Sequence, residues 1–175
     1  IMNLTNPKAE KLLSDIRLLI LDVDGVMTDG YVIYDDDGRE TKMFDVKDGF
    51  GIRLLQMAGI YVCIATGRIG EALRHRCRNL GIDLIFEGLH HKAAIIESLV
   101  AKTGASPSQM AFIGDDLLDL SLMQHVALPI AVADAHTEVI DAALATTHNV
   151  GGKGAVREVC EAILKAQGKW ETILE

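Results

Sequence analysis

Two aspartates, Asp22 and Asp24, come directly after the apolar run Leu18–Leu21 and are followed by Gly25. Large aliphatic residues without a polar face are typical of a strand buried on both sides in a parallel sheet. Ligands bind at the carboxyl ends of such strands, and a glycine there lets backbone N–H groups approach an anion. The pair therefore predicts a ligand site. An acidic turn is the alternative, because Asp-Gly is a common turn-forming pair.

Further polar residues follow other apolar runs in the same way. They are Thr66 with Gly67, Lys92, and Asp115 with Asp116 and Asp119. Because the strands of a parallel sheet end at one edge, we expect these side chains to converge near Asp22 and Asp24. Carboxylates from two loops are what Mg²⁺ accepts, together with a carbonyl oxygen, water and a substrate oxygen. The combination predicts a magnesium site.

A magnesium site of this kind suits phosphoryl transfer. A phosphate ester is a dianion, so an attacking aspartate needs Mg²⁺, Lys92 and hydrogen bonds from Thr66 and the backbone to neutralise the charge. Asp22 can then act as a nucleophile and form an aspartyl-phosphate. Asp24 is the natural candidate to donate a proton in one step and to remove one in the next.

Strands and helices alternate along the rest of the chain. Strands are expected at residues 18–21, 60–65, 83–86, 110–113 and 128–133, and helices at 3–13, 49–58, 70–80, 92–103, 117–124, 136–142 and 154–167. Asp48 is the expected cap of the second helix. Residues 31–34 and 39–45, joined by an Asp-Asp-Asp-Gly turn, predict a β-hairpin that projects beside Asp22. The pattern predicts an α/β fold, a Rossmann-like parallel sheet with helices on both faces.

Composition limits the classes of protein. The 175 residues, 49% of them hydrophobic, suit a single domain with a packed core. A net charge of -8 without a basic face argues against nucleic acid as a partner. We find no apolar run long enough for a membrane span and no signal-peptide pattern, so we expect a cytoplasmic protein. Cys63, Cys77 and Cys160 have neither disulfide nor metal-ligand spacing and are expected to be buried free thiols.

The residues that follow the strands also match known motifs. Residues 22–26, Asp-Val-Asp-Gly-Val, resemble the Asp-x-Asp-x-(Thr/Val) first motif of the haloacid dehalogenase superfamily of phosphatases. Thr66 and Lys92 resemble its second and third motifs, and Gly114-Asp115-x-x-x-Asp119 its fourth, all in the same order. Four motifs in order are far more specific than any one of them.

The resemblance implies a role for each matching residue. Asp22 would be the nucleophile, and Asp24 the general acid/base whose backbone carbonyl binds Mg²⁺. Asp115 would complete the protein ligands of the metal with Asp22. The other residues assigned in this way are the phosphate-binding Gly25, Thr66, Gly67 and Lys92, and Asp116 and Asp119 beside the ligands.

Longer segments are similar to the 3-deoxy-D-manno-octulosonate 8-phosphate phosphatases. They are residues 25–30, 46–52, 65–68, 131–135, 151–158 and 166–170. This resemblance implies a step in making the sugar acid of Gram-negative lipopolysaccharide, and a homotetramer. A similar domain is fused to sialic-acid cytidylyltransferases, so a phosphatase of another sugar-acid phosphate is an alternative. Met27 stands where leucine is usual, which is a small change in an apolar slot.

A sugar-acid phosphate carries a carboxylate beside its phosphate, so its site should offer a cation beyond Lys92. Arg68, in the second-motif loop, is our candidate. Asp48 and Gly49, in one of the matching segments, are further candidates for substrate contact. Residues 151–154, Gly-Gly-Lys-Gly, have two interpretations, an anion-binding loop or a flexible approach to the last helix.

A different class of protein, the receiver module of signalling proteins, also carries an acidic pair, a phosphorylated aspartate, a threonine and a lysine. A receiver needs the phosphorylated aspartate at the end of a middle strand. Here the strand at residues 60–65 ends in Thr66, and Lys92 precedes Asp115. The order of the motifs therefore favours a phosphatase. A non-catalytic oligomerising domain is disfavoured because every motif residue is present.

Many haloacid dehalogenase relatives carry a cap domain after the first or second motif. Residues 30–60 and 67–92 suffice only for a hairpin, helices and one strand, so we expect a capless domain. Water would then reach the site and screen its charges, unless something else closes it. The hairpin at 31–45, and a tail at 168–175 that places Trp170 beyond the last helix without an obvious core, predict a homo-oligomer, a tetramer by resemblance.

Overall fold

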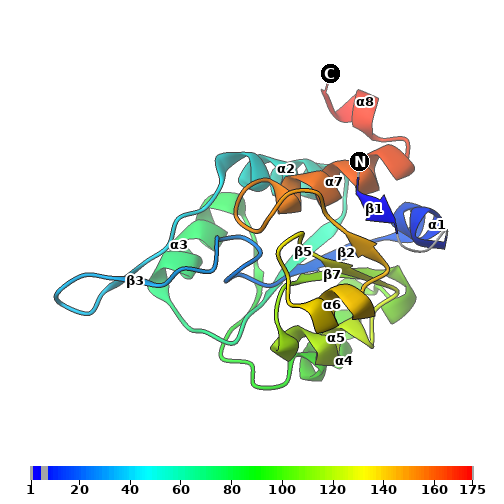
Figure 1. The fold of residues 1–175 in the computed structure, drawn as a ribbon. Coiled ribbons are helices and arrows are strands. Elements are labelled where there is room, and N and C mark those ends of the chain that lie inside the picture. Colours follow the sequence, from blue (N-terminus) through cyan, green and yellow to red (C-terminus); the bar gives the residue numbers. More distant parts are fainter. Residues whose placement is uncertain (1, 5–7, 175) are drawn as a thin grey trace.

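The computed structural model describes residues 2–4 and 8–174, which form a sheet with helices on both sides (Figure 1). The sheet has seven strands in the order β1-β9-β8-β7-β2-β5-β6. They are β1 Asn3–Leu4, β2 Leu18–Leu21, β5 Tyr61–Ala65, β6 Leu84–Phe86, β7 Met110–Gly114, β8 Leu128–Ala131 and β9 Ala145–Thr146. Strands β9 to β6 in this order run parallel, and β1 pairs antiparallel at the edge. The predicted parallel sheet is confirmed.

Strand β2 lies between β5 and β7 and sets the position of the site. Its four residues are all buried, as expected for an apolar strand covered on both faces. Leu18 is level with Tyr61 of β5 and with Met110 of β7. Because the three strands share this register, the loops that begin at Asp22, Thr66 and Asp115 leave the sheet side by side.

Helices cover both faces of the sheet. They are α1 Lys8–Asp15, α2 Val46–Met57, α3 Glu71–Leu80, α4 Ile96–Thr103, α5 Leu120–Met123, α6 Thr137–Ala142, α7 Ala155–Ala166 and α8 Trp170–Leu174. One apolar cluster joins Leu19 and Leu21 of β2 to α1, α2, α3 and α7, and a second joins Leu18 and Ile20 to α4, α5 and α6. Figure 1 shows α2 and α7 above the sheet and α4, α5 and α6 below it. Alternate side chains of β2 thus pack into the apolar clusters on the two opposite faces of the sheet.

The amino-terminal prediction was partly wrong. Asn3 and Leu4 do not open a helix but form β1, which pairs with Thr146 and Ala145 of β9. The helix begins later, at Lys8, and residues 5–7, including Pro7, lie outside the described part of the chain. A two-residue strand at a sheet edge has no periodic signature in the sequence, and its partner β9 was not predicted for the same reason.

The cap of α2 was also assigned to the wrong aspartate. Asp45 is the N-cap residue, and its side chain accepts hydrogen bonds from the backbone N–H groups of Lys47 and Asp48. Asp48 lies within the helix and is buried. Its carboxylate accepts hydrogen bonds from Arg157 N at 2.7 Å and Gly154 N at 3.4 Å, and so caps α7 instead.

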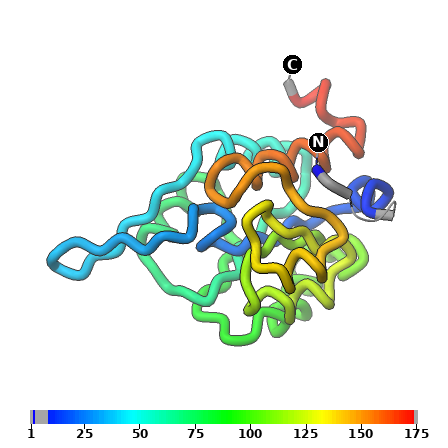
Figure 2. Tube along the Cα trace, in the orientation of Figure 1, coloured from blue at the N-terminus to red at the C-terminus, as the bar shows by residue number. Residues whose placement is uncertain are grey.

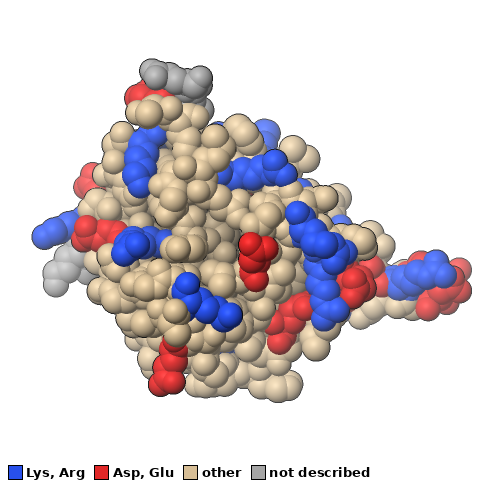
Figure 3. Space-filling model, turned by 180° about the vertical axis from the view of Figure 1, so that it is seen from behind, with Lys and Arg blue, Asp and Glu red and all other residues tan. Residues whose placement is uncertain are grey.

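The predicted hairpin is present and projects from the body of the protein (Figure 2). Its paired strands are short, β3 Ile33–Tyr34 and β4 Glu40–Thr41. Its tip carries charges of both signs (Figure 3), and Arg39 Nη2 lies 3.1 Å from Asp37 Oδ2. Between the first and third motifs the chain forms this hairpin, α2, β5, α3 and β6, which agrees with the capless architecture.

The tail does not match the prediction that it lacks a core of its own. Residues 170–174 form the short helix α8, and Trp170 and Ile173 pack against the cluster that contains α7. Lys165 Nζ lies 4.8 Å from the centre of the Trp170 ring, a cation–π contact that fixes the indole on α7. Glu175 lies outside the described residues.

Two simpler expectations can be compared directly with the structure. Cys63, Cys77 and Cys160 are buried and free, as predicted. Among residues 2–4 and 8–174, none of the helices combines the length and the apolar character that crossing a membrane requires.

Candidate active site

The loop after β2 holds the first two aspartates in a tight backbone turn. Val23 O accepts hydrogen bonds from the N–H groups of Met27 at 2.9 Å and Thr28 at 3.0 Å. Gly25 has φ +87°, and a Cβ atom there would lie 1.9 Å from Asp115 Oδ2. Only glycine fits this position, because any side chain would strain the backbone and collide with a carboxylate. The loop thereby reaches close to the fourth motif.

Lys92 is the cation of the site. Its side chain is 2% exposed, and its Nζ lies 2.8 Å from Asp22 Oδ1 and 2.6 Å from Asp119 Oδ1. Burial alone lowers the pKa of Lys92, but the charges of Asp22 and Asp119 outweigh burial and raise it. Lys92 therefore stays charged and fixes the orientation of the Asp22 carboxylate.

Three carboxylates crowd together beside this lysine. Oxygens of Asp22, Asp115 and Asp119 lie within 4.8 Å of one another. Burial, together with the nearby Asp119 charge, raises the pKa of Asp22 to about 6. Burial and the charges of Asp22 and Asp119 raise the pKa of Asp115 to about 8. A divalent cation would relieve this repulsion, and the group fits the hard oxygen ligands that Mg²⁺ prefers.

The three carboxylates are not equally available to a metal. Asp119 Oδ1 is bound to Lys92, and Asp119 Oδ2 accepts hydrogen bonds from Asp115 N at 2.8 Å and Asp116 N at 3.2 Å. Asp115 Oδ1, by contrast, is buried without a hydrogen-bond partner in the described part of the chain. We therefore assign Asp22 and Asp115 as the side chains that could hold Mg²⁺, and Asp119 as the residue that orients Lys92.

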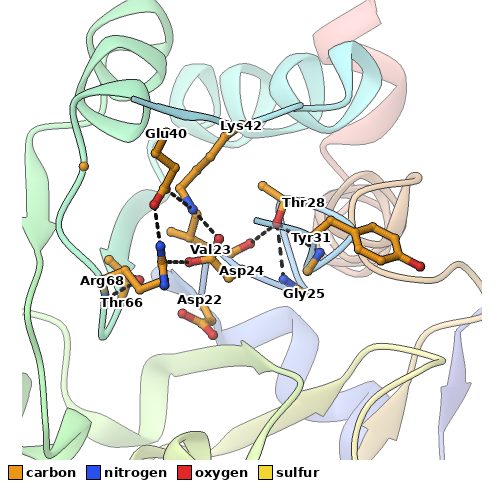
Figure 4. Close-up of polar contacts among 12 residues, drawn as sticks. Asp22, Val23, Asp24, Gly25, Thr28, Tyr31, Glu40, Lys42, Thr66 and Arg68 are labelled. Carbon is orange, nitrogen blue, oxygen red and sulfur yellow. Dashed lines mark hydrogen bonds and ion pairs between the residues drawn. The ribbon is translucent and has the colours of Figure 1, made fainter. Parts of the chain in front are cut away.

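The Asp24 side chain turns away from this carboxylate group. It reaches toward the hairpin, where Asp24 Oδ1 is paired with Lys42 and Asp24 Oδ2 lies 3.7 Å from Arg68 Nε (Figure 4). The predicted metal contact of Asp24 is through its backbone carbonyl. The Asp24 side chain is thus separate from the group of Asp22, Asp115 and Asp119.

Thr66 and Gly67 lie where the strand pattern predicts. Thr66 is buried at the end of β5, its N–H donates to Phe86 O at 3.0 Å, and its Oγ1 accepts from Arg68 N at 3.3 Å. At Gly67 a Cβ would lie 3.4 Å from Leu89 O, which is ordinary van der Waals contact, so the space around Gly67 does not by itself require glycine. The second-motif loop is held by its hydrogen bonds to Phe86 O and within the loop.

Two other predicted residues, Asp48 and Gly49, do not reach the carboxylate group, and a third, Asp116, contacts it through its backbone N–H, which donates to Asp119 Oδ2. Asp48 belongs to α2, and its buried carboxylate lies against the start of α7, where it accepts a hydrogen bond from Arg157 N. A Cβ at Gly49 would lie 2.2 Å from Arg76 Nη2 on α3, so both residues face other elements. We therefore do not retain either residue as a substrate contact. Asp116 Oδ1 accepts from Leu117 N at 2.7 Å, which makes Asp116 the cap of the turn after β7.

The glycine-rich segment 151–154 has a role that neither sequence interpretation anticipated. Gly152 N donates to Val26 O at 2.9 Å, and a Cβ at Gly151 would lie 1.7 Å from Gly25 O. Gly151 N also donates to Asp134 Oδ1 at 2.9 Å. The segment thus packs its backbone directly against the loop of Asp22 and Asp24. The absence of side chains at two adjacent glycines was the available signal, because it permits such an approach.

Sequence reasoning also missed two hairpin residues, Glu40 and Lys42. Both lie beside Asp24 and Arg68, and Lys42 Nζ is 2.8 Å from Glu40 Oε1 (Figure 4). The signal was the period of two along the strand, in which Glu40 and Lys42 share one face while Thr41 and Met43 are exposed on the other. The Lys42 side chain, just after β4, is only 3% exposed, and a charged group that is so well covered needs a partner of opposite charge.

Comparison with known proteins agrees with this geometry. A family model described as haloacid dehalogenase-like hydrolase matches residues 85–159. The 3-deoxy-D-manno-octulosonate 8-phosphate phosphatase of Salmonella typhi is 46% identical over 155 residues, which cover 89% of this chain and 82% of that protein. The crystal structure of the Yersinia pestis phosphatase of that name superimposes with a TM-score of 0.92 at 45% identity, over 94% of this chain and 89% of that chain.

A further solved relative holds ligands. It is the 3-deoxy-D-manno-octulosonate 8-phosphate phosphatase of Moraxella catarrhalis, in complex with a magnesium ion, a phosphate ion and a KDO molecule. Its TM-score is 0.92 at 38% identity, over 95% of this chain and 96% of that chain. Such relatives disfavour the receiver interpretation. The chain belongs to the 3-deoxy-D-manno-octulosonate 8-phosphate phosphatase family of the haloacid dehalogenase-like hydrolases.

Proposed function

We propose that this chain is a Mg²⁺-dependent phosphatase that releases phosphate from 3-deoxy-D-manno-octulosonate 8-phosphate, in the cytoplasm, during lipopolysaccharide synthesis. The observation that carries the proposal is the Asp22 carboxylate, which lies 2.8 Å from the buried Lys92 ammonium in a group with Asp115 and Asp119. The substrate assignment is supported by the Salmonella typhi and Yersinia pestis relatives named for that substrate.

Asp22 attacks the phosphorus atom, so that a P–O bond forms to its carboxylate while the P–O bond to the sugar breaks. Asp24 gives its proton to the departing sugar oxygen. Water then attacks the phosphorus of the aspartyl-phosphate, Asp24 removes a proton from that water, and Asp22 and inorganic phosphate are released. Lys92, Thr66 Oγ1 and the N–H groups of the two glycine-containing loops hold the phosphoryl oxygens.

A bound Mg²⁺ would supply positive charge against the phosphate and the carboxylates. Asp22, Asp115 and the backbone carbonyl of Asp24 would hold it. Two observations support this set. Asp115 Oδ1 is buried and has no hydrogen-bond partner among the described residues, and burial together with the neighbouring carboxylates raises the pKa values of Asp22 and Asp115, an effect that a bound cation would oppose. The magnesium ion of the Moraxella catarrhalis relative is further support.

Arg68 is the proposed contact for the substrate carboxylate. Its side chain is 41% exposed at the edge of the site, where a ligand can reach it. Its guanidinium is bound to Glu40, and Nη2 lies 3.1 Å from Tyr34 Oη, so the hairpin already holds it in place. Arginine binds carboxylates through paired N–H groups, which suits a sugar acid.

The substrate assignment is tested with a panel of phosphate esters assayed for released phosphate. We expect the highest kcat/KM for 3-deoxy-D-manno-octulosonate 8-phosphate, a lower value for a nonulosonate phosphate and the lowest for neutral sugar phosphates. Arg68→Ala should raise KM for the acids more than for the neutral esters, with Arg74→Ala on α3 as the control. A preference for the nonulosonate would select the sialic-acid-type alternative, and equal losses on all esters would remove Arg68 from carboxylate recognition.

The covalent mechanism is tested with Asp24→Asn. The amide keeps the shape and the backbone carbonyl but cannot transfer a proton, so turnover should fall by about 10²- to 10⁴-fold. Phosphorylated protein should accumulate after mixing with substrate and be seen by intact-mass spectrometry. Hydrolysis near the wild-type rate would remove Asp24 from the acid/base role.

We also propose a homo-oligomer, a tetramer by family resemblance. Large apolar side chains are exposed along the base of the hairpin and the start of α2, namely Tyr31, Val32, Ile33, Tyr34, Met43 and Val46. Pairing of hairpins between subunits would cover them. The tail contributes less than predicted, because Trp170 and Ile173 pack on their own core. Light scattering tests the proposal, and a monomer with full specific activity would defeat it.

A further inference from the structure

Strand β4 of the hairpin and the two residues that follow it direct alternate side chains toward the loop of Asp22 and Asp24. Glu40 and Lys42 contact the Asp24 and Arg68 side chains, whereas Met43, the next residue along, is exposed. Successive side chains of an extended strand point in opposite directions, so these contacts define one inward face. The hairpin therefore does more than project from the molecule: its inner face touches the residue proposed to move protons.

Lys42 is the most deeply covered residue of this face. Its side chain is only 3% exposed, and its ammonium is paired with Asp24 Oδ1 and lies 2.8 Å from Glu40 Oε1 (Figure 4). The ammonium thus lies between two carboxyl groups.

Acidic and basic side chains alternate around Lys42. Lys42 contacts Asp24 Oδ1 and Glu40 Oε1, and Arg68 is bound to the remaining Glu40 oxygen. An ammonium that is covered and already paired with two carboxyl groups is not available to bind an incoming phosphate or carboxylate. Arg68 differs, because its side chain is 41% exposed. The two cations therefore have different tasks: Arg68 can meet a ligand, and Lys42 can act only on its neighbours.

The two oxygens of Asp24 also differ. Asp24 Oδ1 is bound by Lys42. Asp24 Oδ2 is buried and has no hydrogen-bond partner within the described residues, with Arg68 Nε at 3.7 Å as the nearest cation contact. An oxygen without a fixed donor is the one that can bind and release a proton.

We propose that Lys42 is a positioning residue for proton transfer: it fixes Asp24 Oδ1 and so presents Asp24 Oδ2 to the reacting oxygen, while Glu40 keeps the ammonium in place. The inference rests on the proposed acid/base role of Asp24. A carboxylate held at one oxygen has lost its rotational freedom before the substrate arrives, and such preorganisation accelerates a reaction without touching the substrate.

The test is a double-mutant cycle that combines Lys42→Met with Asp24→Asn, and Lys47→Met serves as the control. Methionine keeps the unbranched stem and removes the ammonium, and Lys47 is an exposed lysine on α2 without a side-chain partner among the described contacts. Lys42→Met should lower kcat by about 10- to 100-fold with little change in KM, since part of the acid/base contribution is lost. Circular dichroism and the melting temperature establish that each variant is folded.

In the Asp24→Asn background the same substitution should lower kcat less than about threefold, because residues that act through one another are not additive. An undiminished loss in that background would overturn the proposal. So would a large rise in KM at constant kcat, which would make Lys42 a substrate contact. If Asp24→Asn itself turned over at the wild-type rate, the proposed mechanism would fail first, and the two failures are thereby distinguished.

Discussion

Lys92 Nζ lies 2.8 Å from Asp22 Oδ1, and the lysine that reaches the aspartate is almost fully buried. Its second partner, Asp119, is held in turn by the N–H groups of Asp115 and Asp116. Asp119 of the fourth motif therefore orients Lys92 of the third, and Lys92 orients Asp22 of the first. Three carboxylates around one ammonium still leave negative charge in excess when all are ionised, which is the physical reason for a divalent cation at this edge of the sheet.

We expect Lys92→Met to cost stability as well as activity. The substitution leaves Asp119 buried without its cation, and breaking a buried ion pair on one side typically costs about 3 to 5 kcal/mol. Urea unfolding in the presence of a chelator measures this cost. Lys102→Met makes the same change at an exposed position of α4 and should be nearly neutral. Equal stability of the two variants would mean that Lys92 does not hold the site together.

We expect Asp22→Asn to abolish turnover while leaving the fold intact. An amide has the shape of the carboxylate but is a very poor nucleophile. Replacing one charge of the crowded group also relieves repulsion from Asp119, so the metal-free protein should change in stability by no more than about 1 kcal/mol. Phosphate release and thermal unfolding, measured on the same preparation, check both parts. Substantial residual phosphate release would argue against covalent catalysis.

We expect Gly151→Ala to impair catalysis by displacing the loop of Asp22 and Asp24. The added Cβ would lie 1.7 Å from Gly25 O, so either the loop of Asp22 and Asp24 or segment 151–154 must move. Misplacement of a catalytic group by about 1 Å can cost about 10²-fold in rate. Gly104→Ala is the control, because it has φ +68° and open space around it, and so introduces backbone strain far from the site. Matching losses of kcat in both variants would show that general destabilisation is responsible.

The central part of this structure could be predicted because its signals are local. A run of four aliphatic residues predicts β2 as a buried strand. Because neighbouring parallel strands end at the same edge of the sheet, the polar residues that follow them lie close together. The order of the motifs then distinguished a phosphatase from a receiver. These predictions depended on strand type and strand ends, and neither requires knowledge of distant contacts.

The predictions that failed depended on distant contacts. Asp45 and Asp48 both precede the same apolar helix, and a sequence gives no reason to prefer one as its cap. The Asp48 carboxylate instead accepts a hydrogen bond from the N–H of Arg157, 109 positions along the chain, which leaves Asp45 as the cap of α2. The tail likewise packs on the protein because Trp170 contacts the apolar cluster that contains α7. Contacts of this kind come from tertiary packing, which local periodicity does not encode.

The buried Asp48 should give the protein a measurable dependence of stability on pH. Burial, with a smaller contribution from the Asp45 charge, raises the pKa of Asp48 from 3.8 to about 6 in the folded state. The folded protein then binds this proton more tightly than the unfolded chain does. The resulting stability is fully present below pH 3.8 and is lost as the pH rises through about 6.

Asp48→Asn removes this ionisation while keeping an oxygen that can accept from Arg157 N. The free energy of unfolding of the wild type, minus that of Asp48→Asn, should therefore fall by up to about 3 kcal/mol between pH 4 and pH 7. Urea titrations at several pH values in this range measure the difference. Asp37→Asn, at the exposed hairpin tip, changes the net charge equally and should shift stability by no more than about 0.5 kcal/mol throughout. A difference for Asp48→Asn that stays constant with pH would show that the carboxyl is not held in a desolvated environment.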